Sequence, residues 1–103
     1  MSETIEKLVK TIKSRKGRDI KSSYTAFLLS KGNDHCLNKL KEEVTELEDA
    51  IKNKKNTAHE TADVIYHLLV TLESAGVNFD DIITELEKRE GTSGFEEKKN
   101  RRI

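Results

Sequence analysis

The sequence predicts an all-α fold, an antiparallel helical bundle that a second copy of the chain completes. Its 103 residues include no proline and only five glycines, so few positions interrupt a helix. Apolar residues recur at spacings of three and four in nearly every segment, which is the period of a helix face. They make up only 34% of the chain, so one copy buries a thin core and we expect a homodimer. The length is that of a single domain, residues 1–103.

Two helices are predicted in the first third of the chain. Residues 4–16 place apolar side chains on one face, and a basic last turn precedes Gly17, as is usual at a helix end. Residues 22–31 form a shorter helix, which Gly32 ends.

A third helix is predicted to begin at a cap provided by Asn33 or Asp34. Its apolar positions alternate spacings of three and four, which is typical of the core stripe of a helical bundle. These positions are Leu37, Leu40, Val44, Leu47 and Ile51.

Two further helices complete the prediction. The short loop KNKKN separates the third helix from residues 58–75, so these two helices are expected to be antiparallel neighbours. Gly76 ends this helix, and Asn78 or Asp80 begins the last one, which runs through Arg89.

Charge and cysteine content restrict the partners and the location. Lys plus Arg and Asp plus Glu both number 19, so bulk electrostatics favours neither nucleic acid nor a membrane as partner. The single cysteine, Cys36, excludes an internal disulfide. The N-terminus MSETIEKLVK lacks the apolar core of a signal peptide, and no apolar run approaches the roughly 20 residues of a transmembrane helix. We expect a soluble, cytoplasmic protein.

Carboxylates gather on two of the predicted helices. At about 100° of rotation per residue, Glu43 and Glu46 face the same way on the third helix, and Glu60, Asp63 and His67 form a line on the fourth. Carboxylates in partly dry surroundings repel each other and take up protons unless a cation neutralises them. Two oxygen ligands from each of two antiparallel helices suit Mg²⁺ or Mn²⁺.

Ordinary helix chemistry offers an alternative for each of these residues. Lys39 and Glu43 have the spacing of an i,i+4 ion pair, and Thr57 and Glu60 that of a capping box. His67 fits a hydrogen-bonded residue of the core or site wall better than a metal ligand, because Mg²⁺ prefers oxygen.

Motifs at these positions resemble a known superfamily. The pattern EExxE at Glu42, Glu43 and Glu46, followed by ExxD at Glu60 and Asp63, is similar to the signature of all-α nucleoside-triphosphate pyrophosphohydrolases of the MazG type. The segments SSYTAFLLSKG, ADVIYHLLV and REGTSGFEEKKNR narrow the resemblance to the phosphoribosyl-ATP pyrophosphohydrolase family. That family acts in the second step of histidine biosynthesis.

The resemblance implies Mg²⁺-dependent hydrolysis of N1-(5-phosphoribosyl)-ATP to N1-(5-phosphoribosyl)-AMP and pyrophosphate. It implies that the metal ligands are Glu43, Glu46, Glu60 and Asp63. Glu42 is implied as a further catalytic residue that orients water or acts beside the ligands. One carboxylate serves as general base, and which one is left open.

The resemblance also implies a set of substrate-binding residues that contact the phosphates and the nucleoside. They are Ser23, Tyr24, Thr25, Lys31, Lys39, His67, Arg89, Ser93, Gly94 and Lys98. Without the resemblance, Lys39 is equally an ion-pair partner, and the segment after Arg89 reads as a solvated tail.

Two other functions stay open. A house-cleaning nucleoside-triphosphate pyrophosphohydrolase would share the carboxylates, but would not be expected to carry the SYT and RxGxSGxxEK elements. A helical dimerisation module without catalysis would use the apolar stripe for a partner, and would leave the carboxylates on an apolar helix unexplained.

Overall fold

The computed structural model describes residues 3–91, 94 and 95 of the chain. Within these residues there are five α-helices and no strand, which confirms the all-α prediction. The helices are α1 (Glu3–Arg15), α2 (Tyr24–Lys31), α3 (Asn33–Asn53), α4 (Thr57–Ser74) and α5 (Phe79–Lys88). In this part of the chain, no helix is both long enough and apolar enough to cross a membrane.

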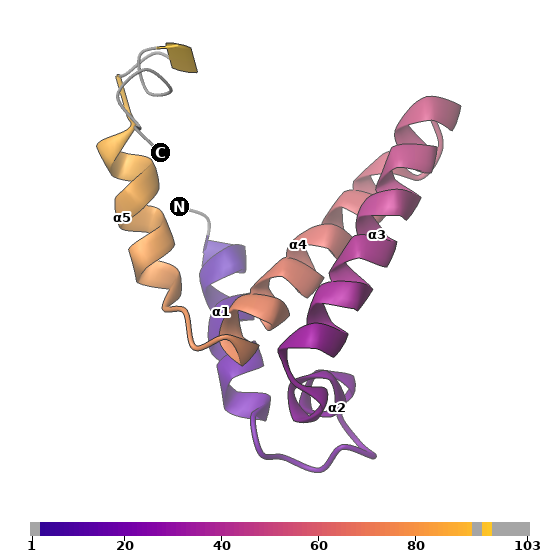
Figure 1. The fold of residues 1–103 in the computed structure, drawn as a ribbon, viewed down its shortest axis with the longest axis vertical. Helices are drawn as coiled ribbons and strands as arrows, with labels where there is room; N and C mark the ends of the chain where they lie inside the picture. The colour runs from indigo at the N-terminus through magenta and orange to yellow at the C-terminus, as the bar shows by residue number, and fades with distance from the viewer. Residues whose placement is uncertain (1–2, 92–93, 96–103) are drawn as a thin grey trace.

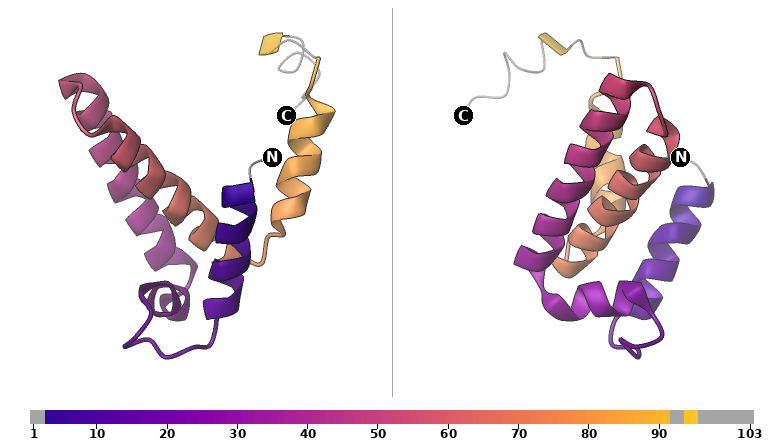
Figure 2. Two further views of the ribbon diagram at one scale, coloured as in Figure 1. Left: turned by 180° about the vertical axis from the view of Figure 1, so that it is seen from behind. Right: turned by 90° about the vertical axis from the view of Figure 1, so that its right-hand side faces the viewer.

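Helices α3 and α4 form an antiparallel hairpin, as their short connection predicted (Figures 1 and 2). Side-chain hydrogen bonds to the opposite backbone fix their register. Near the loop, the Thr57 hydroxyl donates to the carbonyl of Ala50 at 3.3 Å. At the other end, the Thr71 hydroxyl donates to the carbonyl of Cys36, also at 3.3 Å. The residues between these contacts therefore face one another in a defined order.

The core lies where α1 and α2 pack against the hairpin. Its buried residues are Ile12, Leu28, Cys36, Leu69 and Val70. The Cys36 thiol donates to the carbonyl of Leu28 at 3.3 Å, which ties α3 to α2. In Figure 1 the hairpin and α5 diverge from this region as two arms. No residue of α5 is buried.

Three of the five residues in the predicted core stripe of α3 are exposed in the single chain, whereas Leu40 and Leu47 are partly buried. Leu37, Val44 and Ile51 have exposed fractions of 41%, 48% and 57%, whereas Cys36 and Ala50 are buried. The buried line is thus displaced by one residue, because α3 turns the Cys36 and Ala50 face toward α4. On α4 the exposed residues are confined to one strip of the helix, namely Ala58, His59, Ala62, Ile65 and Leu68, with Ile65 36% and Leu68 41% exposed.

The side-chain cap predicted for α5 is present, whereas the one predicted for α3 is absent. The Asn78 side chain caps α5 by accepting from the backbone N–H of Asp80. Helix α3 has Gly32 at its cap without a side-chain bond, and Asn33 lies inside the helix. There the Asn33 side-chain oxygen accepts from the Ser74 hydroxyl at 2.6 Å, so it links α3 to α4 and does not cap α3.

The capping box considered as an alternative role for Thr57 and Glu60 is also absent. Asn56, in a left-handed conformation with φ of 59°, precedes the helix and makes no side-chain cap bond. Thr57 is already inside the helix, and its hydroxyl points across to Ala50. A capping role therefore does not explain why a glutamate occupies position 60 of α4.

Candidate active site

Carboxylates from both helices of the hairpin converge near its loop. Glu43, Glu46 and Glu60 each place one carboxylate oxygen within 4.8 Å of the others. A second group with the same spacing joins Glu60 to Asp63 and to a nitrogen of His59. The two groups share Glu60, so the structure brings together all four residues that the sequence suggested as metal ligands. We call Glu43, Glu46, Glu60 and Asp63 the carboxylate cluster.

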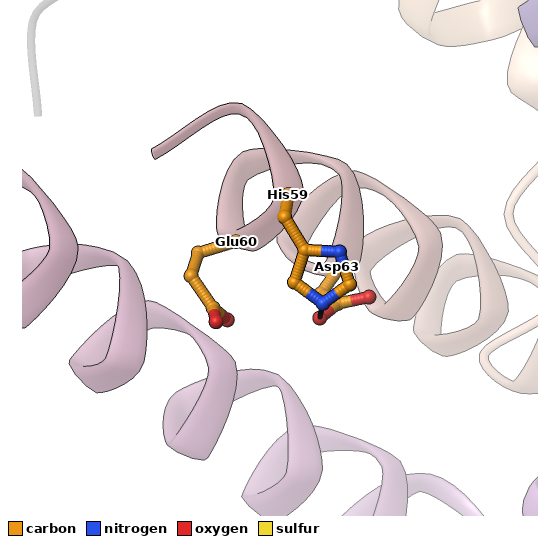
Figure 3. Close-up of side chains that lie close together, drawn as sticks. All are labelled: His59, Glu60 and Asp63. Atoms are coloured by element: carbon orange, nitrogen blue, oxygen red, sulfur yellow. Dashed lines mark ion pairs between the residues drawn. The ribbon is translucent and has the colours of Figure 1, made fainter. Parts of the chain in front are cut away.

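Helix geometry explains the convergence. Glu43 and Glu46 are one turn apart on α3, and Glu60 and Asp63 are one turn apart on α4, so each pair shares a helix face. Figure 3 shows the Glu60 side chain extending from α4 toward the neighbouring helix, with Asp63 and His59 beside it. The register set by Thr57 and Ala50 then places the two faces opposite each other.

The electrostatics of the cluster favour a bound cation. Glu60 Oε1 is buried and has no hydrogen-bond partner among the described residues. Burial raises the pKa of Glu43, the carboxylates of Glu46 and Asp63 raise it further, and the imidazole of His67 offsets part of this effect. Such a group holds its charge poorly unless positive charge is supplied. The donors are carboxylate oxygens, which suits a hard divalent ion.

An open concavity of about 270 Å³ adjoins the cluster and leaves space for a ligand. Glu46 and Glu60 contribute to its wall, together with Asp49, Asn53 and Asn56 from the hairpin tip. The carboxylates can therefore be reached from solvent while one oxygen of Glu60 stays dry.

His59 is a member of the cluster region that the sequence analysis did not select. Its Nε2 lies 3.4 Å from Asp63 Oδ2, and its side chain is 72% exposed. The signal was a histidine four residues before Asp63 and next to Glu60, which places its side chain on the same stretch of α4. An exposed imidazole at this position can orient Asp63.

Lys39 does not pair with Glu43, contrary to the i,i+4 alternative. Its Nζ lies 3.5 Å from Glu42 Oε1, one position earlier. This pairing leaves Glu43 to turn toward Glu46 and Glu60. The Glu42 side chain is 60% exposed and lies outside both carboxylate groups.

The start of α2 and the middle of α4 form a wall beside the cluster. Ser23 caps α2 by accepting from the N–H of Ala26. Tyr24 is 52% exposed, and its ring centroid lies 6.2 Å from that of His67. His67 is buried, and its Nδ1 lies 3.0 Å from the carbonyl oxygen of Asp63.

Thr25 also belongs to this wall, because its hydroxyl is hydrogen-bonded to that of Tyr66. Tyr66 in turn packs edge to face on His67, with 5.0 Å between ring centroids. The SYT element is thereby tied to the helix that carries Glu60 and Asp63.

Three further predicted substrate-binding residues, Lys31, Arg89 and Gly94, are not brought to the cluster within one chain. The Lys31 ammonium lies over the Phe27 ring, 5.5 Å from its centroid. Arg89 follows α5, on the arm that diverges from the hairpin (Figure 1), and its guanidinium pairs with Glu85 at 3.5 Å. At Gly94, the position that a Cβ atom would occupy has no atom of the other described residues within 4 Å, apart from its chain neighbours. Ser93 and Lys98 lie outside the described residues.

An all-α hairpin with two carboxylates on each helix has the architecture of the MazG-like class. Residues 5–90 match the family model described as phosphoribosyl-ATP pyrophosphohydrolase. The chain belongs to this family.

Curated bacterial relatives agree with the family match. A protein of Jannaschia sp. is 46% identical over 99 residues, which are 94% of this chain and 97% of the relative. One of Roseobacter denitrificans is 45% identical over 100 residues, 95% of each chain. One of Rhodobacter capsulatus is 44% identical over 96 residues, 91% of this chain and 93% of the relative. Each is named phosphoribosyl-ATP pyrophosphatase.

Proposed function

We infer that this chain hydrolyses phosphoribosyl-ATP to phosphoribosyl-AMP and pyrophosphate, the second step of histidine biosynthesis. Family membership and the shared name of the relatives support this activity. The structural observation that carries it is the carboxylate cluster, in which Glu60 keeps a buried oxygen without a hydrogen-bond partner among the described residues. A cytoplasmic location goes with this proposal, because highly charged nucleotides do not cross membranes unaided.

We propose Mg²⁺ as the cofactor, with Mn²⁺ as a substitute that accepts the same oxygen ligands. Glu43, Glu46, Glu60 and Asp63 would hold it. When bound, such an ion polarises a phosphoanhydride and favours a hydroxide-like water. A carboxylate that does not bind the metal would accept the proton of the attacking water. The raised pKa of Glu43 makes that residue a stronger base than an ordinary glutamate.

The test of the proposed function is pyrophosphate release from phosphoribosyl-ATP, ATP and dUTP, each with Mg²⁺ and with excess chelator. We expect chelator-sensitive release from phosphoribosyl-ATP, with much slower release from the other two. Faster turnover of ATP or dUTP would assign the chain to house-cleaning pyrophosphohydrolases. No release from any substrate would leave the non-catalytic helical module.

Metal binding should also stabilise the fold in a pH-dependent way. Because the folded-state pKa of Glu43 is raised, its contribution to stability is present at low pH and is lost as pH rises through that pKa. Mg²⁺ at a hundred times its dissociation constant should then add about 2.7 kcal/mol at neutral pH. We expect the increase in Tm to shrink in mildly acidic buffer, where protons compete for Glu43. An equal increase with NaCl at matched ionic strength would contradict specific binding.

We further propose that the chain forms a homodimer through one face of the hairpin. Leu37, Val44 and Ile51 are exposed and seven residues apart, the repeat by which helices pack on a partner helix. On α4, Ile65 and Leu68 are also exposed. We call these five residues the apolar face.

Helix geometry places the apolar face on one side of the hairpin. Val44 is two residues from Glu46, and Ile65 is two residues from Asp63, which is a rotation of about 160° in each case. Because the carboxylates of both helices meet at Glu60, the apolar residues of both helices share the opposite side. A second hairpin laid on this side by a two-fold axis would complete a four-helix bundle. The small core of the single chain, with seven buried apolar residues among those described, supports such a partner.

A further inference from the structure

A second concavity lies at the turn between α1 and α2. Its volume is about 430 Å³, and its lining consists of Arg15, Arg18, Asp19, Ser22 and Ser23. None of these residues belongs to the carboxylate cluster, and only Ser23 was expected to contact substrate. We call it the arginine pocket.

The charges of the arginine pocket favour an anion. Among the described residues, neither Arg15 nor Arg18 has a carboxylate within ion-pair distance, whereas Lys39, Lys52 and Arg89 do. The lining therefore holds two guanidinium groups that pair with no carboxylate in the described part of the chain, and the one carboxylate of Asp19. Helix α2, which begins at this pocket, has no acidic residue in its first turn.

Asp19 has a structural role in shaping this turn. Its Oδ1 accepts from the backbone N–H of Lys21 at 3.0 Å. Its carbonyl accepts from the backbone N–H groups of Ser22 and Ser23 at 3.2 and 3.1 Å, and from the Ser22 hydroxyl at 3.3 Å. These bonds hold the serines next to the arginines, so the acidic residue organises the turn around the two guanidinium groups.

The arginine pocket is connected to the carboxylate cluster through the wall described above. Ser23 lines the pocket and is followed by Tyr24, whose ring packs near His67. His67 contacts the backbone of Asp63 in the cluster. A ligand lying along this wall would have one end at the carboxylates and the other at the arginines.

We propose that Arg15 and Arg18 bind a phosphate monoester, with the Ser22 hydroxyl turning from the Asp19 carbonyl to donate to a phosphate oxygen. Guanidinium forks match phosphate oxygens with two parallel hydrogen bonds each, which an isolated ammonium cannot do. Resting on the proposed function, the ligand is the 5'-phosphate of the ribosyl group, at the opposite end of the substrate from the triphosphate. ATP and dUTP have no such ribosyl 5'-phosphate in addition to their triphosphate. The arginine pocket thereby selects the phosphoribosylated nucleotide over simple triphosphates.

A kinetic comparison tests this selection. We expect Arg15→Gln and Arg18→Gln each to raise KM for phosphoribosyl-ATP by about tenfold. The ratio of kcat/KM for phosphoribosyl-ATP to that for ATP should fall by a similar factor. The matched control is Lys16→Gln with Lys21→Gln, which removes two positive charges from the same segment outside the pocket lining. An equal fall of the ratio in this control would overturn the proposal, because it would show that positive charge anywhere in this segment has the same effect as the arginines of the pocket.

A binding measurement tests the site independently of turnover. Amide signals of Ser22 and Ser23 should shift when inorganic phosphate or ribose 5-phosphate is titrated into the full chain. The Arg15→Gln, Arg18→Gln double variant should bind at least about tenfold more weakly, with its helical circular dichroism unchanged. Amide shifts that persist in the double variant would exclude the site, and so would the absence of shifts in the natural chain. Either result would exclude it even if the chain hydrolyses phosphoribosyl-ATP. Phosphate binding without turnover of any nucleotide would instead refute the proposed function alone.

Discussion

Glu43→Gln is expected to lower kcat/KM for phosphoribosyl-ATP by at least about a hundredfold. Glutamine keeps the size of the side chain but removes the negative charge that Glu43 shares with Glu46 and Glu60. The position is only half-buried, so the helical fold should persist. Relief of repulsion in the cluster should even raise the Tm of the metal-free protein, since the pKa of Glu43 is raised in the folded state. Steady-state pyrophosphate release and thermal unfolding measure the two effects.

The matched control for this variant is Glu48→Gln on the same helix. Glu48 pairs with Lys52 on the surface at 3.2 Å, outside the cluster. Loss of this exposed pair should leave turnover within about twofold of the natural value. Asp63→Asn tests the α4 side of the cluster in the same way. Full activity in Glu43→Gln or Asp63→Asn would remove that residue from the site.

Val44→Asp is expected to convert the proposed dimer into a monomer. Val44 lies in the middle of the apolar face on α3, where it is 48% exposed in the single chain. A two-fold interface would bury the new carboxylate of each copy without a partner, which costs several kcal/mol. The dissociation constant should therefore rise by at least about a hundredfold. Light scattering after size-exclusion chromatography over a range of concentrations measures the change.

Thr45→Asp is the control for charge alone, because Thr45 is the next residue on α3 and is exposed on a different side of the helix. It should remain dimeric. Leu68→Asp examines the α4 half of the apolar face and should dissociate the dimer as well. A natural chain that is monomeric at tens of micromolar would disprove the dimer. Dimers of unchanged stability in both Val44→Asp and Leu68→Asp would place the interface on another surface.

The order of helices could be predicted from the sequence because few residues interrupt them. Gly17, Gly32 and Gly76 all adopt positive φ values in the structure, where other residues are strained, and each lies within two residues of a helix end. The two acidic lines were also evident, since helical rotation alone places Glu43 with Glu46 and Glu60 with Asp63.

Finer features could not be predicted because local patterns compete on nearly equal terms. Thr57 and Glu60 have the spacing of a capping box, yet the Thr57 hydroxyl bonds across the hairpin to Ala50. Lys39 had Glu42 and Glu43 within reach on the same helix, and it pairs with Glu42. Differences of a few tenths of a kcal/mol decide such choices, and they depend on the neighbouring helix.

The sequence by itself determined an all-α chain, the order of its helices and the two lines of carboxylates, because these depend on helix breakers and on rotation along a single helix. Only the tertiary structure decided that Glu60 meets Glu43 and Glu46, that Leu37, Val44 and Ile51 stay exposed, and that Arg15 and Arg18 line one concavity. Each of these features depends on the register and rotation of one element against another. Those are set by contacts between residues distant in sequence, such as Thr71 with Cys36.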